Sequence, residues 1–454
     1  MKNNCDILII GGGTAGWLSA AFLSFYNPDK KIILVEDPNI PTIGVGEGTF
    51  PSTMYLLNKM GIKPKDLIVK SNGSLKMGIE YTDFAENKFW LTTEPTSVWE
   101  LFGSEMVKSL AAFDKCPVLL DDDSSFFGCH FVASDLVEVL KEHAKKHGVI
   151  HISDKVIDVK VNHNFCDEIT LESGDTLSSK WFIDSTGFAK VLISKTDSSF
   201  KDYSKELLVD SAVVTPTQYK NKKEEFKAYT RITAKECGWM FKIPTWSRIG
   251  NGYVYSSAFI NKESAEKVLK DVTGADTFKH LKMTLGYYDK LINGNIVAVG
   301  LSGGFIEPME ATAIHLTERT LIAFNEVLKG EKTESEANQY LKDKIRYIKT
   351  LILAHYALSE RTEPFWIAAR EAAENSAEIK EFFSKLKNGK YPTSEDKLDI
   401  SYPYCQWNEL LKGFGKDHYY PNINSQSKKE LYLASYYLPN HFDYINTLRG
   451  NNNE

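Results

Sequence analysis

Long apolar runs, patterned cysteines and clustered basic residues are scarce in this sequence of 454 residues. The first apolar run, Ile7–Ile10, meets glycines at once and is too short for a signal or membrane-spanning segment. The six cysteines form no C-x-x-C pair, which is typical of reduced thiols and predicts neither a metal site nor a disulfide framework. The net charge is −6 and the basic residues are scattered, which argues against nucleic acid. We therefore expect a soluble, cytoplasmic protein without a membrane or nucleic-acid partner.

What is present is the composition of a globular enzyme. Hydrophobic residues make up 43% of the chain and charged residues 25%, which excludes disordered and fibrous classes. The length predicts two or three lobes around a substantial core.

The N-terminal segment has the order strand, glycine turn, helix, strand, acid. An apolar run from Asp6 to Ile10 enters the turn Gly11–Gly16, a helix is predicted over Trp17–Tyr26, and a buried strand over Lys31–Val35 ends at Glu36. This is the pattern of a Rossmann-type dinucleotide site.

Each part of this pattern has a physical reason. Gly11 permits the tight turn, Gly13 lets a pyrophosphate approach the backbone, and Gly16 allows close helix-to-strand packing. Glu36, twenty residues past Gly16, is placed to accept a ribose hydroxyl, and an acid there indicates an unphosphorylated ribose, as in FAD or NAD. The expected cofactor-binding residues of the turn and second strand are Gly11, Gly13, Thr14, Ala15, Gly16 and Glu36.

A second α/β stretch is predicted to return to the same sheet. The helix Leu136–His147 precedes strands at Val156–Val161, Glu168–Leu171 and Trp181–Asp184, and Asp184 ends the last strand, where ligands of open α/β sheets bind. Asp184 is therefore a further cofactor-binding candidate. An antiparallel sheet is expected within Val209–Phe259, followed by helices that include Glu336–Tyr356 and Glu371–Lys387.

Two motifs carry a resemblance to a known family. Ile10–Trp17 (IGGGTAGW) followed by Ile43–Thr49 (IGVGEGT) resembles the flavin-dependent tryptophan-halogenase family. The resemblance favours FAD over NAD and implies that the residues of the second motif, Ile43, Gly44, Val45 and Gly46, also contact FAD.

The resemblance also implies a fold and a division of the chain. We expect an α/β, Rossmann-type FAD-binding domain of the flavin monooxygenase type, with an antiparallel sheet and a mainly helical C-terminal substrate lobe. The FAD-binding domain is expected to be discontinuous, over residues 1–70, 105–210 and 285–335, and the substrate-binding lobe over 71–104, 211–284 and 336–454.

Two residues match the catalytic pair of the family. Ser74–Ile79 (SLKMGI) is similar to the family's lysine segment, which makes Lys76 the residue that receives hypohalous acid, although a surface lysine on a strand is the ordinary alternative. Gly303–Thr312 (GGFIEPMEAT) is similar to the family's Glu-Pro-Leu-Glu-Ser-Thr run and makes Glu310 the second catalytic acid. Without the resemblance, Glu310 would be read as a capping acid at a helix start.

The resemblance implies three further groups of residues. Backbone N–H groups of Thr312 and Ala313 are expected to bind halide, while Ala311 replaces the usual serine. A wall between flavin and substrate is expected from Trp239, Phe241, Ile243 and Pro244, where the family's second tryptophan is phenylalanine; a core strand is the alternative. Substrate contacts are expected from Phe365, Trp366 and Trp407, but the family's tyrosine pair reads Trp407-Asn408, so an amino-acid pocket is not carried over.

The predicted activity is therefore that of a flavin-dependent halogenase. The resemblance implies that reduced FAD, supplied by a separate flavin reductase, and O2 form a flavin hydroperoxide that oxidises chloride, bromide or iodide to hypohalous acid. Lys76 then delivers the halogen to an electron-rich, indole-like or phenol-like aromatic substrate. An FAD-dependent aromatic monooxygenase and a non-catalytic FAD-binding protein are the alternatives, and a homo-oligomer is left open.

Overall fold

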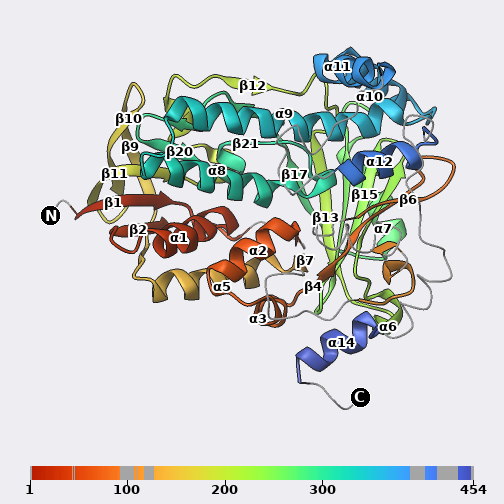
Figure 1. Ribbon diagram of the computed structural model, residues 1–454, viewed down its shortest axis with the longest axis horizontal. Coiled ribbons are helices and arrows are strands. Elements are labelled where there is room, and N and C mark those ends of the chain that lie inside the picture. Colours follow the sequence, from red (N-terminus) through yellow and green to blue (C-terminus); the bar gives the residue numbers. More distant parts are fainter. Residues whose placement is uncertain are drawn as a thin grey trace. The chain divides into compact units, whose positions relative to one another are not determined.

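The computed structural model describes residues 3–42, 44, 47–92, 107–108, 110–116, 127–388, 404–416 and 438–450 (Figure 1). The chain divides into two compact units, each built from three segments. Unit 1 comprises Met1–Gly44, Ala133–Ser204 and Thr284–Lys349, and unit 2 comprises Val45–Val132, Lys205–Met283 and Thr350–Glu454. The predicted division also gives each part three segments, but residues 45–70, 105–132 and 205–210 fall in unit 2, and residues 284 and 336–349 in unit 1.

Unit 1 is built on an eight-stranded, mainly parallel sheet. Its main path runs β19-β20-β11-β1-β2-β8, and β10 joins β11 to β9. The strands are β1 Asn3–Ile10, β2 Ile32–Glu36, β8 Ile150–Ser153, β9 Val156–Asn162, β10 Phe165–Leu171, β11 Thr176–Asp184, β19 Ile292–Asn293 and β20 Ile296–Ala298. Because β1, β2 and β11 are parallel neighbours, their carboxyl ends lie at one edge of the sheet.

Apolar residues fill this sheet and the helices of unit 1. Helix α1 (Thr14–Tyr26) packs against α5 (Ala133–Lys146) and α8 (Thr312–Leu328), and α9 (Glu334–Leu358) follows α8 in the chain. The side-chain amide of Asn27 donates to Asn325 across the α1–α8 contact, at 2.9 Å. A small antiparallel sheet completes the unit, from β12 (Phe200–Asp202), β18 (Gly286–Tyr288) and β21 (Gly304–Phe305). The predicted strands and the helix at Leu136–His147 are thus confirmed.

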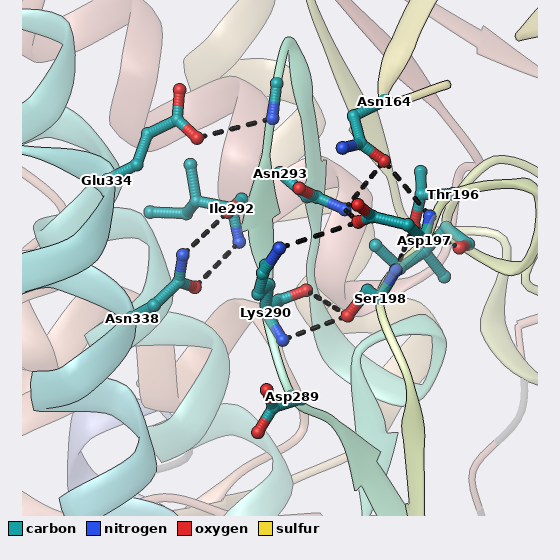
Figure 2. Close-up of polar contacts among 12 residues, drawn as sticks. Asn164, Thr196, Asp197, Ser198, Asp289, Lys290, Ile292, Asn293, Glu334 and Asn338 are labelled. Carbon is teal, nitrogen blue, oxygen red and sulfur yellow. Dashed lines mark hydrogen bonds and ion pairs between the residues drawn. The ribbon is translucent and has the colours of Figure 1, made fainter. Parts of the chain in front are cut away.

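A polar network fixes the short β19–β20 hairpin of unit 1 (Figure 2). The buried amide of Asn338 accepts from the N–H groups of Leu291 and Ile292, at 2.9 and 3.1 Å, and donates to the carbonyl of Ile292 at 2.7 Å. On the other side of the hairpin, Asn293 donates to Asn164 and Asp197. One helix side chain therefore satisfies three backbone groups that a two-residue strand leaves open.

Unit 2 contains a seven-stranded sheet in the order β17-β13-β16-β15-β14-β5-β6. The strands are β5 Gly78–Thr82, β6 Phe89–Thr92, β13 Ser211–Thr217, β14 Thr230–Lys235, β15 Gly238–Pro244, β16 Ile249–Tyr255 and β17 Lys279–Lys282. The antiparallel sheet predicted within Val209–Phe259 is confirmed, and β14 also pairs in parallel with β5. Helix α7 (Lys262–Thr273) packs on β13 and β16 around a core that includes Val213, Tyr253 and Leu269.

A second, three-stranded sheet in unit 2 runs β3-β7-β4, with β3 at Glu47–Gly48, β7 at Gly128–Phe131 and β4 at Ser74–Lys76. Helices α2 (Pro51–Lys59) and α3 (Pro64–Lys70) connect β3 to β4. Both outer strands pair with the central β7, so that Gly48 and Ser74 both lie opposite His130.

Further helices in the described part of unit 2 are α6 Lys222–Glu225, α10 Pro364–Asn375, α11 Ala377–Lys387, α12 Tyr404–Gly413 and α14 His441–Leu448. The prediction of one helix over Glu371–Lys387 is wrong. Ser376 has an extended backbone, and its side chain accepts from the N–H of Ile379, so it ends α10 and caps a new helix. No helix in the described part of the chain is long and apolar enough to span a bilayer.

We predict that Asn338→Leu lowers the free energy of unfolding by about 3 kcal/mol, because three buried backbone groups lose their partner. The control Gln339→Ala removes an exposed amide from the same helix and should cost less than about 0.5 kcal/mol. Urea unfolding of both variants measures the difference, and equal stability of the two would contradict the role given to Asn338.

Candidate functional site

The glycine turn at the end of β1 is shaped to receive a pyrophosphate. Gly11 has φ +112° and its hydrogen faces the carbonyl of Ser185, so that a Cβ there would lie 2.5 Å from that oxygen. A Cβ on Gly16 would lie 1.9 Å from the carbonyl oxygen of Gly11, whereas a Cβ on Gly13 would meet nothing within 4 Å. Gly11 and Gly16 are therefore required by the fold, and the space beside Gly13 is open for a ligand.

Helix α1 presents its N-terminus at this turn. Gly13 is the N-cap, no side chain caps the helix, and its first turn, which includes Thr14 and Ala15, carries no acid. The N–H groups and the positive end of the helix dipole therefore remain available for an anion. These residues fit the phosphates of a dinucleotide.

Glu36 ends the neighbouring parallel strand and lies over the turn. Its carboxylate is 2.7 Å from Nε2 of His151 and 3.4 Å from Nζ of Lys141, and it accepts from Nε1 of Trp17 at 3.4 Å. A Cβ on Gly12 would lie 1.6 Å from its Oε2. The acid is thus held at the glycine turn, as the ribose-binding prediction requires, and that prediction stays open to test.

The carboxylate of Asp184, at the end of β11, accepts hydrogen bonds from neighbouring residues of the chain. Its carboxylate accepts from Thr186 through one oxygen and from the N–H groups of Leu192 and Ile193 through the other, at 2.8 and 2.9 Å. Asp184 therefore orders the loop after β11. Its predicted contact with the cofactor stays a prediction.

The second glycine motif is described only in part. Ile43, Val45 and Gly46 lie outside the described residues, while Gly44 is exposed and Glu47–Gly48 form β3. Burial raises the pKa of Glu47 to about 7. Gly48 faces the lysine of the neighbouring segment: a Cβ there would lie 3.1 Å from Cδ of Lys76.

Lys76 is a buried lysine and not a surface residue of its strand. Its side chain is 0% exposed, and Nζ lies 5.0 Å from the centroid of the Phe50 ring. Gly128 pairs with Lys76, and a Cβ on Gly128 would lie 2.5 Å from the carbonyl oxygen of Thr49. Two glycines and an aromatic face thus make the space that the lysine occupies. Because burying an ammonium is costly, a buried lysine of this kind is a candidate functional residue.

The segment around Glu310 belongs to unit 1. Glu307 and Glu310 are both buried, and the short turn Pro308–Glu310 leads through Ala311 into α8. Ala311 has φ 54° and ψ 40°, the left-handed region that residues other than glycine seldom adopt. The first turn of α8, which starts at Thr312 and Ala313, has neither a capping side chain nor an acidic residue. It therefore leaves N–H groups at a positive helix end, as a halide site needs.

The expected wall lies on β15 in unit 2. Trp239 is fully buried and its Nε1 donates to the hydroxyl of Tyr356 at 3.3 Å, while the ring of Phe241 lies over Gly252 on β16. Pro244 is buried at the end of the strand and Ile243 is half-buried. Gly252 on the neighbouring strand thus leaves room for the ring of Phe241. Shielding of substrate from flavin stays a prediction.

The three residues expected at the substrate are packed into unit 2. Phe365 and Trp366 lie in α10, where Nε1 of Trp366 donates to the carbonyl of Lys235 at 2.7 Å. Trp407 lies in α12 against Phe382, with ring centroids 4.7 Å apart. These are contacts of core residues, and a role in substrate binding stays a prediction.

His130 was not singled out in the sequence. It is fully buried on β7, and its Nδ1 lies 3.1 Å from Oγ of Ser74, two residues before Lys76. Its Nε2 lies 2.8 Å from Oγ1 of Thr230 on β14. The only sequence signal was a histidine in an apolar segment, and its partners are far along the chain.

Comparison with known proteins assigns this geometry to a family. The tryptophan halogenase family matches residues 6–116 and 120–426. The chain belongs to the tryptophan halogenase family. Tryptophan 7-halogenase KtzQ of Kutzneria sp. is 30% identical over 423 residues, 81% of this chain and 78% of the relative. Tryptophan 6-halogenase SttH of Streptomyces toxytricini is 29% identical over 366 residues, 69% of this chain and 70% of the relative.

Solved structures agree with the assignment. A tryptophan halogenase from Shewanella frigidimarina superposes with a TM-score of 0.85 at 25% identity, covering 98% of this chain and 97% of that chain. This halogenase is therefore a flavin-dependent enzyme with the mixed α/β fold of its relatives. The predicted family, fold class and halogenation activity are confirmed.

An added methyl group is expected to weaken FAD binding at Gly13, where the space is open, and to lower stability at Gly16, where the backbone contact is tight. Gly13→Ala should leave the Tm of the flavin-free halogenase unchanged and raise the Kd for FAD at least about 10-fold, because the methyl group occupies the place of the pyrophosphate. Gly16→Ala should cost about 1–3 kcal/mol of stability through its clash with the turn. Thermal melts and flavin-fluorescence titrations measure both, and normal FAD binding by Gly13→Ala would contradict the site.

Stability should fall in mild acid. Burial holds the pKa of His130 well below 6.5 and lowers those of His143 and His441 to about 4. The unfolded halogenase then binds more protons at these residues between about pH 4 and 6.5, which favours unfolding. Glu47, with its raised pKa, has the opposite effect, but burial also lowers the pKa of His151, which acts in the same direction as the three histidines above. We expect the Tm to fall as the pH is lowered through this window, and His143→Phe to reduce the slope; a flat or rising Tm would contradict the prediction.

Proposed function

We propose that this halogenase uses Lys76 to transfer an electrophilic halogen to a small, electron-rich aromatic substrate of the indole or phenol class. The observation that carries the proposal is the complete burial of the Lys76 ammonium between Gly48, Gly128 and Phe50, in the segment that resembles the family's lysine motif. Lysine side chains ordinarily bury the methylene stem and keep the ammonium in water, so complete burial sets Lys76 apart from an ordinary surface lysine.

The cofactor proposed is FAD, delivered reduced by a separate flavin reductase. The glycine turn, the N-terminus of α1 and Glu36 would hold its diphosphate and ribose. Bound reduced flavin supplies, with O2, the oxidising chemistry that converts halide to hypohalous acid. The halide, chloride or bromide or iodide, would be held by the N–H groups of Thr312 and Ala313 at the uncapped start of α8.

The residues of the chain divide the transfer between them. The ammonium of Lys76 donates a hydrogen bond to hypohalous acid, which makes the halogen more electrophilic. Alternatively, the amine, after losing a proton, forms an N–halogen bond as the halogen–oxygen bond breaks and water leaves. The halogen–carbon bond forms as the bond from halogen to oxygen or nitrogen breaks, and the oxygen leaves as water. Glu310 then accepts the ring proton as a general base. Its complete burial supports a task other than capping a helix.

Relatives differ in the ring position of tryptophan that they halogenate. KtzQ is a tryptophan 7-halogenase and SttH a tryptophan 6-halogenase. At about 30% identity, a tryptophan-like aromatic is the substrate class that we propose, without a ring position.

Lys76→Met tests the proposal, because methionine fills most of the buried volume without an amine. Full-length protein, FAD, a flavin reductase, NADH, O2 and bromide are incubated with tryptophan, indole and phenol, and products are identified by mass. We expect wild type to give a bromine isotope doublet and Lys76→Met to lose it by at least about 100-fold, with the Kd for FAD unchanged. Undiminished bromination by the variant contradicts the role of Lys76, and a gain of one oxygen by wild type indicates a monooxygenase.

A further inference from the structure

The strand that carries Lys76 is supported unequally at its two edges. β4 has three residues and lies at the end of its sheet, and among the residues that the structure describes it pairs with one strand, β7. At the other edge, the buried N–H of Leu75 donates to Nε2 of His441, at 3.3 Å. A histidine 366 residues along the chain thus takes the place of a neighbouring strand directly beside Lys76.

His441 is built into a fixed orientation. It is 0% exposed, and its ring stacks on Phe226 with centroids 4.7 Å apart and planes 8° from parallel. Nδ1 lies 3.5 Å from the carbonyl oxygen of Phe226, which can only accept a proton. Since the N–H of Leu75 can only donate, Nε2 must be unprotonated and the ring neutral.

Helix α14, which carries His441, grips the segment before Lys76 at a second point. Nη2 of Arg449, just past the end of the helix, donates to the carbonyl of Val69 at 2.9 Å and to Oδ1 of Asn72 at 3.1 Å. The start of the helix is also anchored, because the N–H of His441 donates to the carbonyl of Asp114 at 2.8 Å. The helix therefore fixes the segment that leads into β4.

At the opposite edge β4 pairs with β7, and the side chain of His130 on β7 also contacts that of Ser74. Oγ of Ser74 donates its one proton to the carbonyl of Pro244 at 2.8 Å, so it must accept from Nδ1 of His130. Burial holds the pKa of His130 well below its ordinary value, so the ring is neutral and its Nε2 accepts from the hydroxyl of Thr230 at 2.8 Å. After Lys76 the strand turns away, where the N–H of Met77 donates to the carbonyl of Ala228 at 2.7 Å.

We propose that His441 is a positioning residue for halogen transfer: its neutral imidazole fixes the free edge of β4 and thereby holds Lys76 between Gly48 and Phe50. This inference rests on the proposed function of Lys76. Displacement of a reacting group by about 1 Å can cost about 100-fold in rate. His441 acts through the backbone of Leu75 and does not touch the substrate.

Two substitutions separate the hydrogen bond from the packing. His441→Phe keeps a flat ring to stack on Phe226 but offers no acceptor to Leu75, whereas His441→Gln offers an amide oxygen close to the place of Nε2 and loses the ring. Asp443→Asn is the matched control, because Asp443 is exposed on the same helix and pairs only loosely with Lys223, at 3.7 Å.

The measurement is a single turnover with full-length protein in excess over chemically reduced FAD, mixed with O2, bromide and indole or tryptophan. The readout is brominated product per FAD, beside the Tm and the Kd for FAD. Partial unfolding would lower FAD binding together with product, whereas a displaced Lys76 lowers product alone. We expect at least about a 10-fold loss for His441→Phe, recovery to within about 3-fold of wild type for His441→Gln, and no change for Asp443→Asn.

The outcomes distinguish this inference from the function on which it rests. If wild type and Lys76→Met give the same yield, the role of Lys76 fails. If Lys76→Met loses the product while His441→Phe retains it, only the positioning role of His441 is overturned. If His441→Phe does not fold, His441→Gln decides: a loss of yield as large as that of Lys76→Met, at unchanged FAD binding, overturns the claim that an acceptor for Leu75 is what the site requires.

Discussion

The burial of one ammonium group is the constraint on which the second unit depends. Lys76 gives up its hydration, and the sequence accommodates it with residues that have no bulk of their own: Gly48 on β3 and Gly128 on β7. Phe50 adds the negative face of an aromatic ring, which favours a cation. Any side chain at either glycine would have to enter the lysine's space or a backbone carbonyl. The small β3-β7-β4 sheet therefore encloses the charged side chain of Lys76.

Unit 1 faces the corresponding problem for anions, whereas unit 2 buries a cation. Unit 1 leaves two helix starts uncapped, where backbone N–H groups could receive an anion. Helices α1 and α8 both lack a capping side chain and an acid in the first turn. The N-cap residue of α1 is Gly13, and that of α8 is Ala311 in a left-handed conformation; neither has a side chain that can accept a hydrogen bond. Helix dipoles supply positive potential with little desolvation, which suits a diphosphate and a small halide.

The sequence predicts what depends on local chemistry and misses what depends on distant contacts. The glycine turn, Glu36 and the strands around them follow a fixed spacing, so the order of residues is enough to place them. Lys76 could be named by its segment, but its burial could not, because the glycines that create the space are 28 and 52 residues away in the chain. His441 lacked any signal, since its partners Leu75 and Phe226 come from other elements. The helix break at Ser376 was local and could have been found from its capping serine.

A histidine at the edge of β4 can bond to the strand without extending the hydrogen-bond ladder, which another strand could not do. A neighbouring strand would present both donors and acceptors and would extend the ladder past Lys76, whereas the lysine segment must end where its side chain turns into the buried space. A neutral imidazole offers one acceptor and no continuation. The chain can then leave β4 at once, with the N–H of Met77 bonded to Ala228. The lysine segment is thus positioned through the backbone of Leu75, and no further strand is needed beside Lys76.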